Sequence, residues 1–164
     1  MLSDFDAFYM ASHTQTIRSV RLLCASTAEA EDAVAEAYAR AYGRWAEVAR
    51  MDRPDAWVRR VAMNQATDQH RLRMRDRLAW PRLTPPQSRE GPEQADSTDL
   101  VAALRRLPPR RRHVLVLYYV ADRSVADIAA ELSLPAGSVK AHLSRGRAQL
   151  ASLLHLDLEV LHEH

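Results

Sequence analysis

The sequence predicts an all-α protein with two small helical domains joined by a flexible linker, the second domain containing a helix-turn-helix. Apolar residues recur every three or four positions in most segments, as on the buried face of a helix. Of the 164 residues, only 4 are glycine and 6% are aromatic, while 47% are hydrophobic. The periodicity stops between residues 83 and 97, where Pro85, Pro86, Gly91 and Pro92 lie. We therefore expect a first domain over residues 1–80, a linker over 81–97, a second domain over 98–156 and a tail over 157–164.

Composition excludes several classes of protein. One cysteine, Cys24, rules out a disulfide framework and a cysteine-based zinc site within the chain. No apolar run approaches the roughly 20 residues of a membrane span, and the N-terminus has no basic leader, so we expect a cytoplasmic protein without membrane insertion. Gly-rich phosphate loops and the common hydrolase motifs are missing from the sequence. We therefore expect no enzyme activity, no metal and no cofactor.

The first domain should begin with a helix capped by Ser3 or Asp4. Six residues at helical spacing are expected to form its core, here and in the segment that follows: Phe5, Phe8, Tyr9, Ile17, Val20 and Cys24. Ser26 and Glu29 then form a capping-box pair that opens a long helix. Its inner stripe is predicted to contain Val34, Tyr38, Ala41, Trp45 and Val48.

The opposite face of this long helix is mainly acidic, with Glu29, Asp32, Glu36, Arg40 and Glu47. Small residues on the same face, Ala35, Ala39 and Gly43, leave the backbone accessible. A basic partner helix could bind there. The charge pattern alone favours a merely solvated face.

The next helix should start near Asp52 and Pro54, with Trp57, Val58 and Val61 turned inward. The predicted outer side contains Arg59, Met63, Thr67 and His70. Arginines are dense from Arg53 to Arg77 and alternate with polar residues, a composition typical of a nucleic-acid surface. Trp57 fits either a base-stacking residue or a core residue.

In the second domain, Ser97 or Thr98 should cap a helix whose apolar positions are Leu100, Ala103, Leu104 and Leu107. The pair Pro108 and Pro109 breaks the helical pattern. The following stripe contains Val114, Leu117, Tyr118 and Ala121.

The segment from Arg123 to Leu150 has the pattern of a helix-turn-helix. Ser124 and Asp127 cap its first helix, and Pro135 fits the first turn of the second. Val139, Leu143, Gly146 and Leu150 lie on one side of the second helix, and Ala141, Ser144, Arg145 and Ala148 lie opposite, flanked by Ser138, Lys140 and Arg147. A small, cationic outer face of this kind is typical of a helix that enters the major groove of DNA. An ordinary helical hairpin with solvated charges has the same periodicity.

Three segments in this order resemble an extracytoplasmic-function (ECF) sigma factor of bacterial RNA polymerase, with actinobacterial Ala and Arg usage. AEDAVAEAYARAYGRW is similar to the polymerase-binding helix of that family, and RPDAWVRRVAMNQATDQHRLRMR is similar to its helix for the −10 promoter element. LRRLPPRRRHVLVLYYVADRSVADIAAELSLPAGSVKAHLSRGRAQL is similar to its −35-binding domain. The most specific motif is Pro135 to Lys140 at the start of the last helix.

The resemblance implies a sigma factor that directs core RNA polymerase to promoter DNA and initiates transcription, with an anti-sigma factor as a further possible partner. It implies polymerase contacts by Asp32, Glu36 and Arg40. It implies −10 contacts by Asn64 and Asp68, to which the basic run adds Arg59, Arg71 and Arg73. The −35 duplex would face Pro135, Ser138, Lys140, Ala141, Ser144, Arg145 and Arg147, with Arg145 central enough to address guanine. The alternative is a stand-alone helix-turn-helix DNA-binding regulator, which leaves the acidic helix unexplained.

Overall fold

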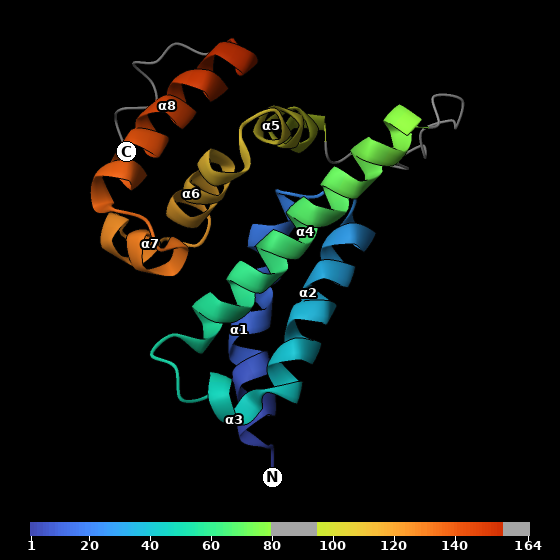
Figure 1. Ribbon diagram of the computed structural model, residues 1–164, viewed down its shortest axis with the longest axis vertical. Coiled ribbons are helices and arrows are strands. Elements are labelled where there is room, and N and C mark those ends of the chain that lie inside the picture. Colours follow the sequence, from blue (N-terminus) through green and yellow to red (C-terminus); the bar gives the residue numbers. More distant parts are fainter. Residues whose placement is uncertain (80–94, 156–164) are drawn as a thin grey trace. The chain divides into compact units, whose positions relative to one another are not determined.

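The computed structural model describes residues 1–79 and 95–155, except the side chains of residues 70, 73, 74, 76–79 and 95–98. The chain divides into two compact units, Met1–Gly91 and Pro92–His164. Every regular element in the described ranges is a helix (Figure 1), which confirms the all-α prediction. Most of the predicted linker and the whole predicted tail lie outside the described residues. None of the helices in the described ranges is long and apolar enough to span a membrane.

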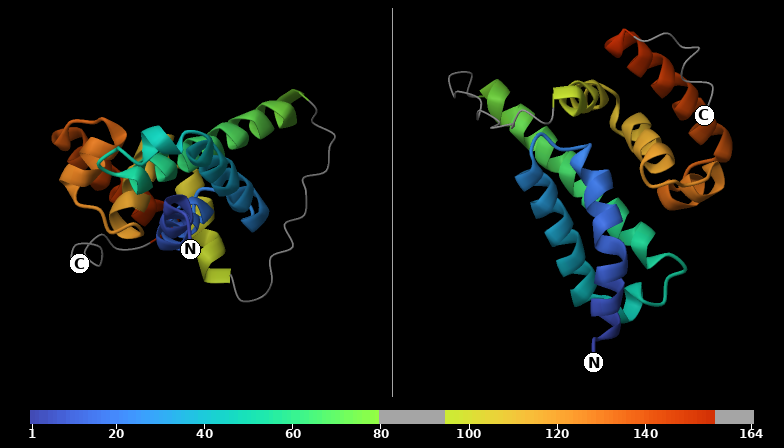
Figure 2. Two further views of the ribbon diagram at one scale, coloured as in Figure 1. Left: turned by 90° about the horizontal axis from the view of Figure 1, so that it is seen from below. Right: turned by 180° about the vertical axis from the view of Figure 1, so that it is seen from behind.

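The first unit is built on α1 (Asp4–Arg21), α2 (Thr27–Gly43) and α4 (Pro54–Ala79), and each of these three helices contacts the other two. They lie alongside one another in the views of Figures 1 and 2, and the short α3 (Trp45–Val48) lies between α2 and α4 in the chain. The side chains that fill the space between the three helices are fully buried. They include Val20, Leu23, Val34, Val58 and Met63.

Side chains cap the first two helices, as the sequence predicts. The Ser3 hydroxyl accepts from the Asp6 amide at 3.2 Å, and the Asp6 carboxylate accepts from the Ser3 amide at 3.1 Å. The Ser26 hydroxyl accepts from the Glu29 amide at 3.2 Å, but the Glu29 carboxylate accepts from Ala25, one residue before the cap, at 3.1 Å. Both helices therefore begin with their first-turn amides partly satisfied.

The predicted continuous helix through Val48 is wrong, because α2 ends at Gly43. Arg44 leaves the helical region at φ −122° and ψ 26°, and α3 starts at the next residue. This change of direction places the Trp45 ring 5.3 Å from the Phe5 ring and 5.0 Å from the Phe8 ring. Packing of these aromatic rings against α1 favours the break over one more helical turn.

Tyr9 was expected in the core but is 39% exposed. Its ring packs edge-on against Tyr38 at 4.9 Å and lies 4.7 Å from His13. Tyr38 is the buried member of this group, and its hydroxyl bonds Ser12 at 2.7 Å and Thr16 at 3.3 Å. Burial raises the pKa of Tyr38 above its usual value, while its hydrogen bonds with Ser12 and Thr16 act in the opposite direction.

The second unit contains α5 (Ala95–Arg105), α6 (Pro109–Tyr119), α7 (Val125–Leu132) and α8 (Ala136–Leu154). Helix α5 begins two residues before Ser97, so the predicted cap position is wrong, and Leu100 is 38% exposed instead of buried. Pro108 separates α5 from α6 as predicted. Helix α8 contacts α5, α6 and α7, and the shared core includes Leu104, Leu107, Val114, Leu117, Ile128, Val139 and Leu143.

Candidate functional site

Helices α7 and α8 form the helix-turn-helix that the sequence predicts. The Ser124 hydroxyl caps α7 by accepting from the Asp127 amide at 3.1 Å. The helix ends at Ser133, a left-handed residue at φ 54° and ψ 48°, and the Leu134 amide returns to the Ala129 carbonyl at 2.9 Å. Pro135 is the N-cap residue of α8, one position earlier than expected. This short connection fixes the direction in which α8 leaves α7.

Helix α8 packs closely on α6 at Gly146. A Cβ atom on Gly146 would lie 2.7 Å from Leu115 Cδ1 and 3.1 Å from Arg111 Cγ, closer than carbon atoms pack. Val139 and Leu143 are buried on the same side of α8. The inner face of α8 is therefore the one that the sequence predicts, and its opposite face is directed away from the core of the unit.

The outer face of α8 has small residues in the middle and basic residues at both edges. Ser144 and Ala148 are exposed, and at about 100° per residue they mark the centre of the outer face. Lys140 and Arg147 lie on one edge, and Arg145 lies on the other. Arg145 is exposed, and the expectation that it addresses guanine stays a prediction. Of the remaining predicted residues, Pro135 is exposed, and Ser138 and Ala141 are half-buried.

Aromatic rings border the edge that contains Arg147. Its Cζ atom lies 5.5 Å from the centroids of both Tyr118 and Tyr119, and its Nε donates to the Tyr119 hydroxyl. The two tyrosines, at the end of α6, pack edge to face at 5.0 Å. Sequence reasoning placed Tyr118 on an apolar stripe and did not find this cluster.

Arginines of α6 border the opposite edge. Burial, together with the charges of Arg111, Arg145 and Arg110, lowers the pKa of His142 below its usual value. The Arg111 guanidinium also donates to Gln149 of α8 at 2.7 Å. Both edges of α8 thus lie in a positive field, although the formal net charge of the chain is only +2.

In α4 the structure corrects the predicted faces. Arg59, Met63 and Thr67 were expected outside, but all three are buried and Arg59 is only 1% exposed. The reason is that α4 packs against both α1 and α2, so its buried face is wider than one apolar stripe. Asp55 lies 3.6 Å from the Arg59 guanidinium and supplies the opposite charge that a buried cation requires. Arg59 therefore does not belong to the exposed basic surface of this structure.

The exposed stripe of α4 runs through Asn64, Asp68 and Arg71, three predicted −10 residues at helical spacing. Arg60 and Arg75 continue the stripe in the two directions; they belong to the predicted basic run but were not among the predicted −10 residues. Their spacing of four residues from Asn64 and from Arg71 was the available signal. The side chain of Arg73 lies outside the described residues.

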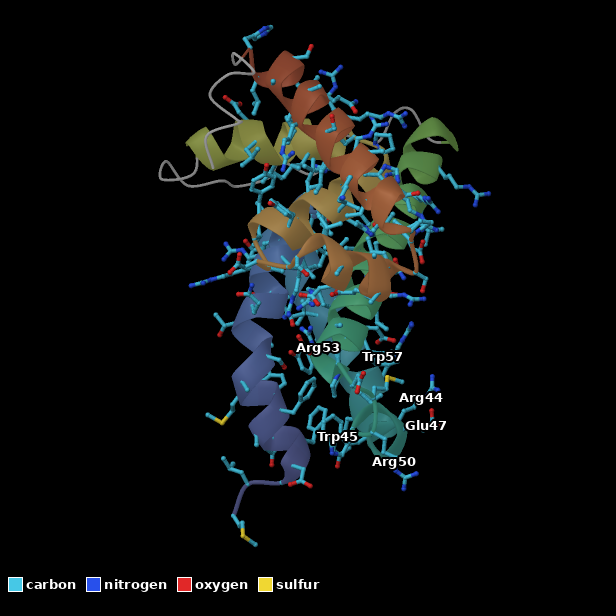
Figure 3. The ribbon with its side chains drawn as sticks, turned by 90° about the vertical axis from the view of Figure 1, so that its left-hand side faces the viewer. Arg44, Trp45, Glu47, Arg50, Arg53 and Trp57 are labelled. Atoms are coloured by element: carbon cyan, nitrogen blue, oxygen red, sulfur yellow. The ribbon has the colours of Figure 1, made fainter. Side chains whose placement is uncertain are left out.

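Basic side chains also gather where α3 meets the start of α4 (Figure 3). Arg44 lies 6.0 Å from the Trp57 ring centroid and forms an ion pair with Glu47 at 2.6 Å. Arg50 is exposed beside them, while Trp45 points toward α1. Trp57 is half-buried, so one part of its ring packs inside and another meets a cation.

The predicted polymerase-binding residues of α2 share one exposed face. Asp32, Glu36 and Arg40 are all exposed, and Glu36 pairs with Arg40 at 2.8 Å. Ala39 is exposed between them, and a Cβ atom on Gly43 would meet nothing within 4 Å. This face can accept a closely packed partner helix.

The described residues hold no group of three His, Cys, Asp or Glu side chains that could bind a metal ion.

Comparison with known proteins gives two matching families. Residues 8–77 match Sigma-70 region 2, and residues 97–150 match Sigma-70, region 4.

The curated relatives include the RNA polymerase sigma-E factor of Streptomyces coelicolor, 32% identical over 148 residues that cover 90% of this chain and 84% of the relative. The ECF RNA polymerase sigma factor SigM of Mycobacterium tuberculosis is 34% identical over 158 residues, covering 92% of this chain and 76% of the relative. Among solved structures, the sigma factor RpoE of Bartonella quintana, crystallised with the anti-sigma factor NepR, superimposes with a TM-score of 0.78. That match covers 95% of this chain and 99% of RpoE at 23% identity, and it shows a shared fold.

Proposed function

The chain belongs to the ECF sigma factors of bacterial RNA polymerase, and we propose that it acts through three separate surfaces on its two units, two for promoter DNA and one for core polymerase. As a sigma factor it directs core RNA polymerase to specific promoters and initiates transcription. In this proposal the polymerase performs the chemistry, and this chain has no catalytic residue of its own. The observation that carries the proposal is the order of the surfaces along the chain: an acidic helix, a basic polar helix and a helix-turn-helix.

The outer face of α8 is proposed to read the −35 element. Small side chains at its centre, Ala141, Ser144 and Ala148, allow the helix backbone to approach the floor of a major groove about 12 Å wide. The two phosphate backbones that border such a groove would face the two basic edges, one with Lys140 and the other with Arg145. Positive charge at both edges therefore fits a duplex better than it fits a single strand.

The exposed stripe of α4 is proposed to hold the −10 element after it melts. Asn64 and Asp68 offer hydrogen-bonding groups to bases that have lost their partners, and Arg71 supplies charge for the backbone. Trp57, with Arg44 beside its ring, offers a partly exposed aromatic surface near the start of the same helix. Arg59 is not part of this proposal, because its side chain is buried.

The exposed face of α2 with Asp32, Glu36 and Arg40 is proposed to bind core polymerase. Its acidic side chains and small residues suit a basic helix of the partner. A stand-alone DNA-binding regulator would explain the second unit but would give this face no role. We further propose that the protein acts in the cytoplasm with the polymerase, and that an anti-sigma factor binds it, as NepR binds the related RpoE.

Run-off transcription with purified core polymerase tests the proposal. Addition of the full chain should produce transcripts of defined length from its promoters, and core polymerase alone should not. A chain with Asn64→Ala and Asp68→Ala should still bind core polymerase but should open promoters poorly, whereas Asp32→Arg with Glu36→Arg should lose the polymerase. Specific DNA binding by the free chain without any effect on transcription would overturn the proposal and favour the stand-alone regulator.

A further inference from the structure

Arg147 is held by two tyrosines in a geometry that leaves part of its guanidinium group available. The guanidinium carbon lies 5.5 Å from both ring centroids, and the rings of Tyr118 and Tyr119 meet at an interplanar angle of 77°. The Nε–H is used by the Tyr119 hydroxyl, so the two terminal nitrogens remain for another acceptor. Helices α6 and α8, which carry these residues, are packed together at Gly146.

The charge of Arg147 is not neutralised within the described part of the chain. Its hydrogen-bond acceptor is a neutral phenol, and the ion pairs in this part of the chain involve other arginines. Tyr119 is 49% exposed and Arg147 is half-buried, so the cluster lies at the surface of the unit. A fixed cation whose two terminal nitrogens have no partner among the described residues fits the two oxygens of a phosphate.

We propose that Tyr118 and Tyr119 are positioning residues that orient Arg147 toward one phosphate at the edge of the −35 duplex. The inference rests on the proposed function of α8 and adds to it a contact that is prepared before DNA arrives. An arginine free in solvent loses rotamer freedom when it binds a phosphate, whereas this arginine is already ordered by two rings and a hydrogen bond. Lys140, on the same edge, has no such support among the contacts of the described residues.

A purely structural cluster is the competing explanation, in which the tyrosines cover the α6–α8 contact and Arg147 covers the tyrosines. The two explanations differ in one measurable respect. Positioning makes the effect of the tyrosine depend on the presence of Arg147 in DNA binding. A structural role affects the stability of the unit and lowers the binding of all variants alike.

The test uses holoenzyme assembled from core polymerase and the full chain, with promoter DNA titrated at several salt concentrations. Arg147→Ala should weaken binding about tenfold on all −35 sequences and should lower the slope of log affinity against log salt by about one. Tyr119→Phe keeps the ring and removes the acceptor, and it should weaken binding by about two- to tenfold. Arg147→Lys keeps the charge but not the paired donors, and should lose affinity while it retains most of the slope.

A double-mutant cycle decides the matter. Tyr119→Phe should add no further loss in a chain that already has Arg147→Ala. Arg106→Ala removes another exposed charge of the same unit and should leave both affinity and slope unchanged. Equal losses from Tyr119→Phe with and without Arg147, or an unchanged slope for Arg147→Ala, would overturn the inference. A wild-type holoenzyme that fails to bind any promoter would instead refute the proposed function itself.

Discussion

Gly146→Val should destabilise the second unit, because Gly146 lies where α8 crosses α6. The Cβ atom alone would lie 2.7 Å from Leu115 Cδ1 and 3.0 Å from Leu115 Cγ, and valine adds two more carbons there. Leu115 is only 2% exposed, so it has little space into which it can move. The new side chain must therefore separate the two helices or force strained rotamers.

The expected magnitude follows from two opposing effects. Overpacking of a well-packed core costs about 1–3 kcal/mol. Replacement of glycine by valine in a helix restores about 0.3 kcal/mol of helix propensity. Gly137→Val, in the first turn of the same helix, has the same propensity gain, and its Cβ meets nothing within 4 Å. The difference between the two variants should thus be about 1–3 kcal/mol, and each kcal/mol lowers the melting temperature of such a small unit by about 4–8 °C.

Two optical probes separate the units in this experiment. In a Trp80→Phe background the two remaining tryptophans, Trp45 and Trp57, lie in the first unit, so their fluorescence reports on that unit. Far-ultraviolet circular dichroism reports on the helices of both units. Gly146→Val should lower the stability seen by circular dichroism and leave the fluorescence transition unchanged. Equal stability of the Gly146→Val and Gly137→Val proteins would refute close packing at this crossing.

Three further predictions concern binding and pH. Asp32→Arg with Glu36→Arg should abolish co-purification with core polymerase without lowering the melting temperature, since exposed charges contribute little to folding; wild-type co-purification would exclude this face as the contact. The free chain should bind promoter DNA weakly in gel shifts and gain affinity with core polymerase, because the flexible linker that the sequence predicts would not fix the spacing of two small surfaces; nanomolar specific binding by the free chain would contradict this. The pKa of His142 is lowered in the folded chain, so between that pKa and the ordinary value near 6.5 the unfolded chain binds more protons than the folded chain. The stability of the second unit should therefore fall as the pH drops through this window. His142→Gln should reduce this pH dependence in circular dichroism melts, and an unchanged dependence would contradict it.

The sequence predicted the helix-turn-helix in detail because its signals are local. Ser124 and Asp127 are three residues apart and cap α7 as expected. Val139, Leu143 and Gly146 are spaced so that only one face of α8 can be buried, and that face is the one in contact with α6. Capping and amphipathic spacing depend on a few neighbouring residues, so no knowledge of the rest of the fold was needed.

The faces of α4 could not be predicted in the same way. A helix that packs against two others buries a wide arc, and a polar residue within that arc is buried by tertiary contacts in spite of its own polarity. Arg59 is such a residue, with Asp55 one helical turn earlier as its ion-pair partner. Its charge suggested the solvent side, and the partner that permits its burial is separated from it by only four positions. The spacing from Asp55 to Arg59 was visible in the sequence, but the second neighbouring helix was not.

The net charge of the chain says little about its partners, because acidic and basic side chains lie on different surfaces. Acidic residues dominate the exposed face of α2, arginines line the exposed stripe of α4, and basic residues occupy both edges of α8. The basic residues at the two edges of α8 also differ in the side chains that surround them. Aromatic rings hold Arg147 without adding charge, whereas on the other edge Arg145 lies near His142 and the arginines of α6. The like charges at the Arg145 edge repel one another in the free chain, and DNA phosphates reduce this repulsion. The Arg145 edge should therefore contribute more to DNA affinity than the Arg147 edge, and its contribution should fall more when salt is added.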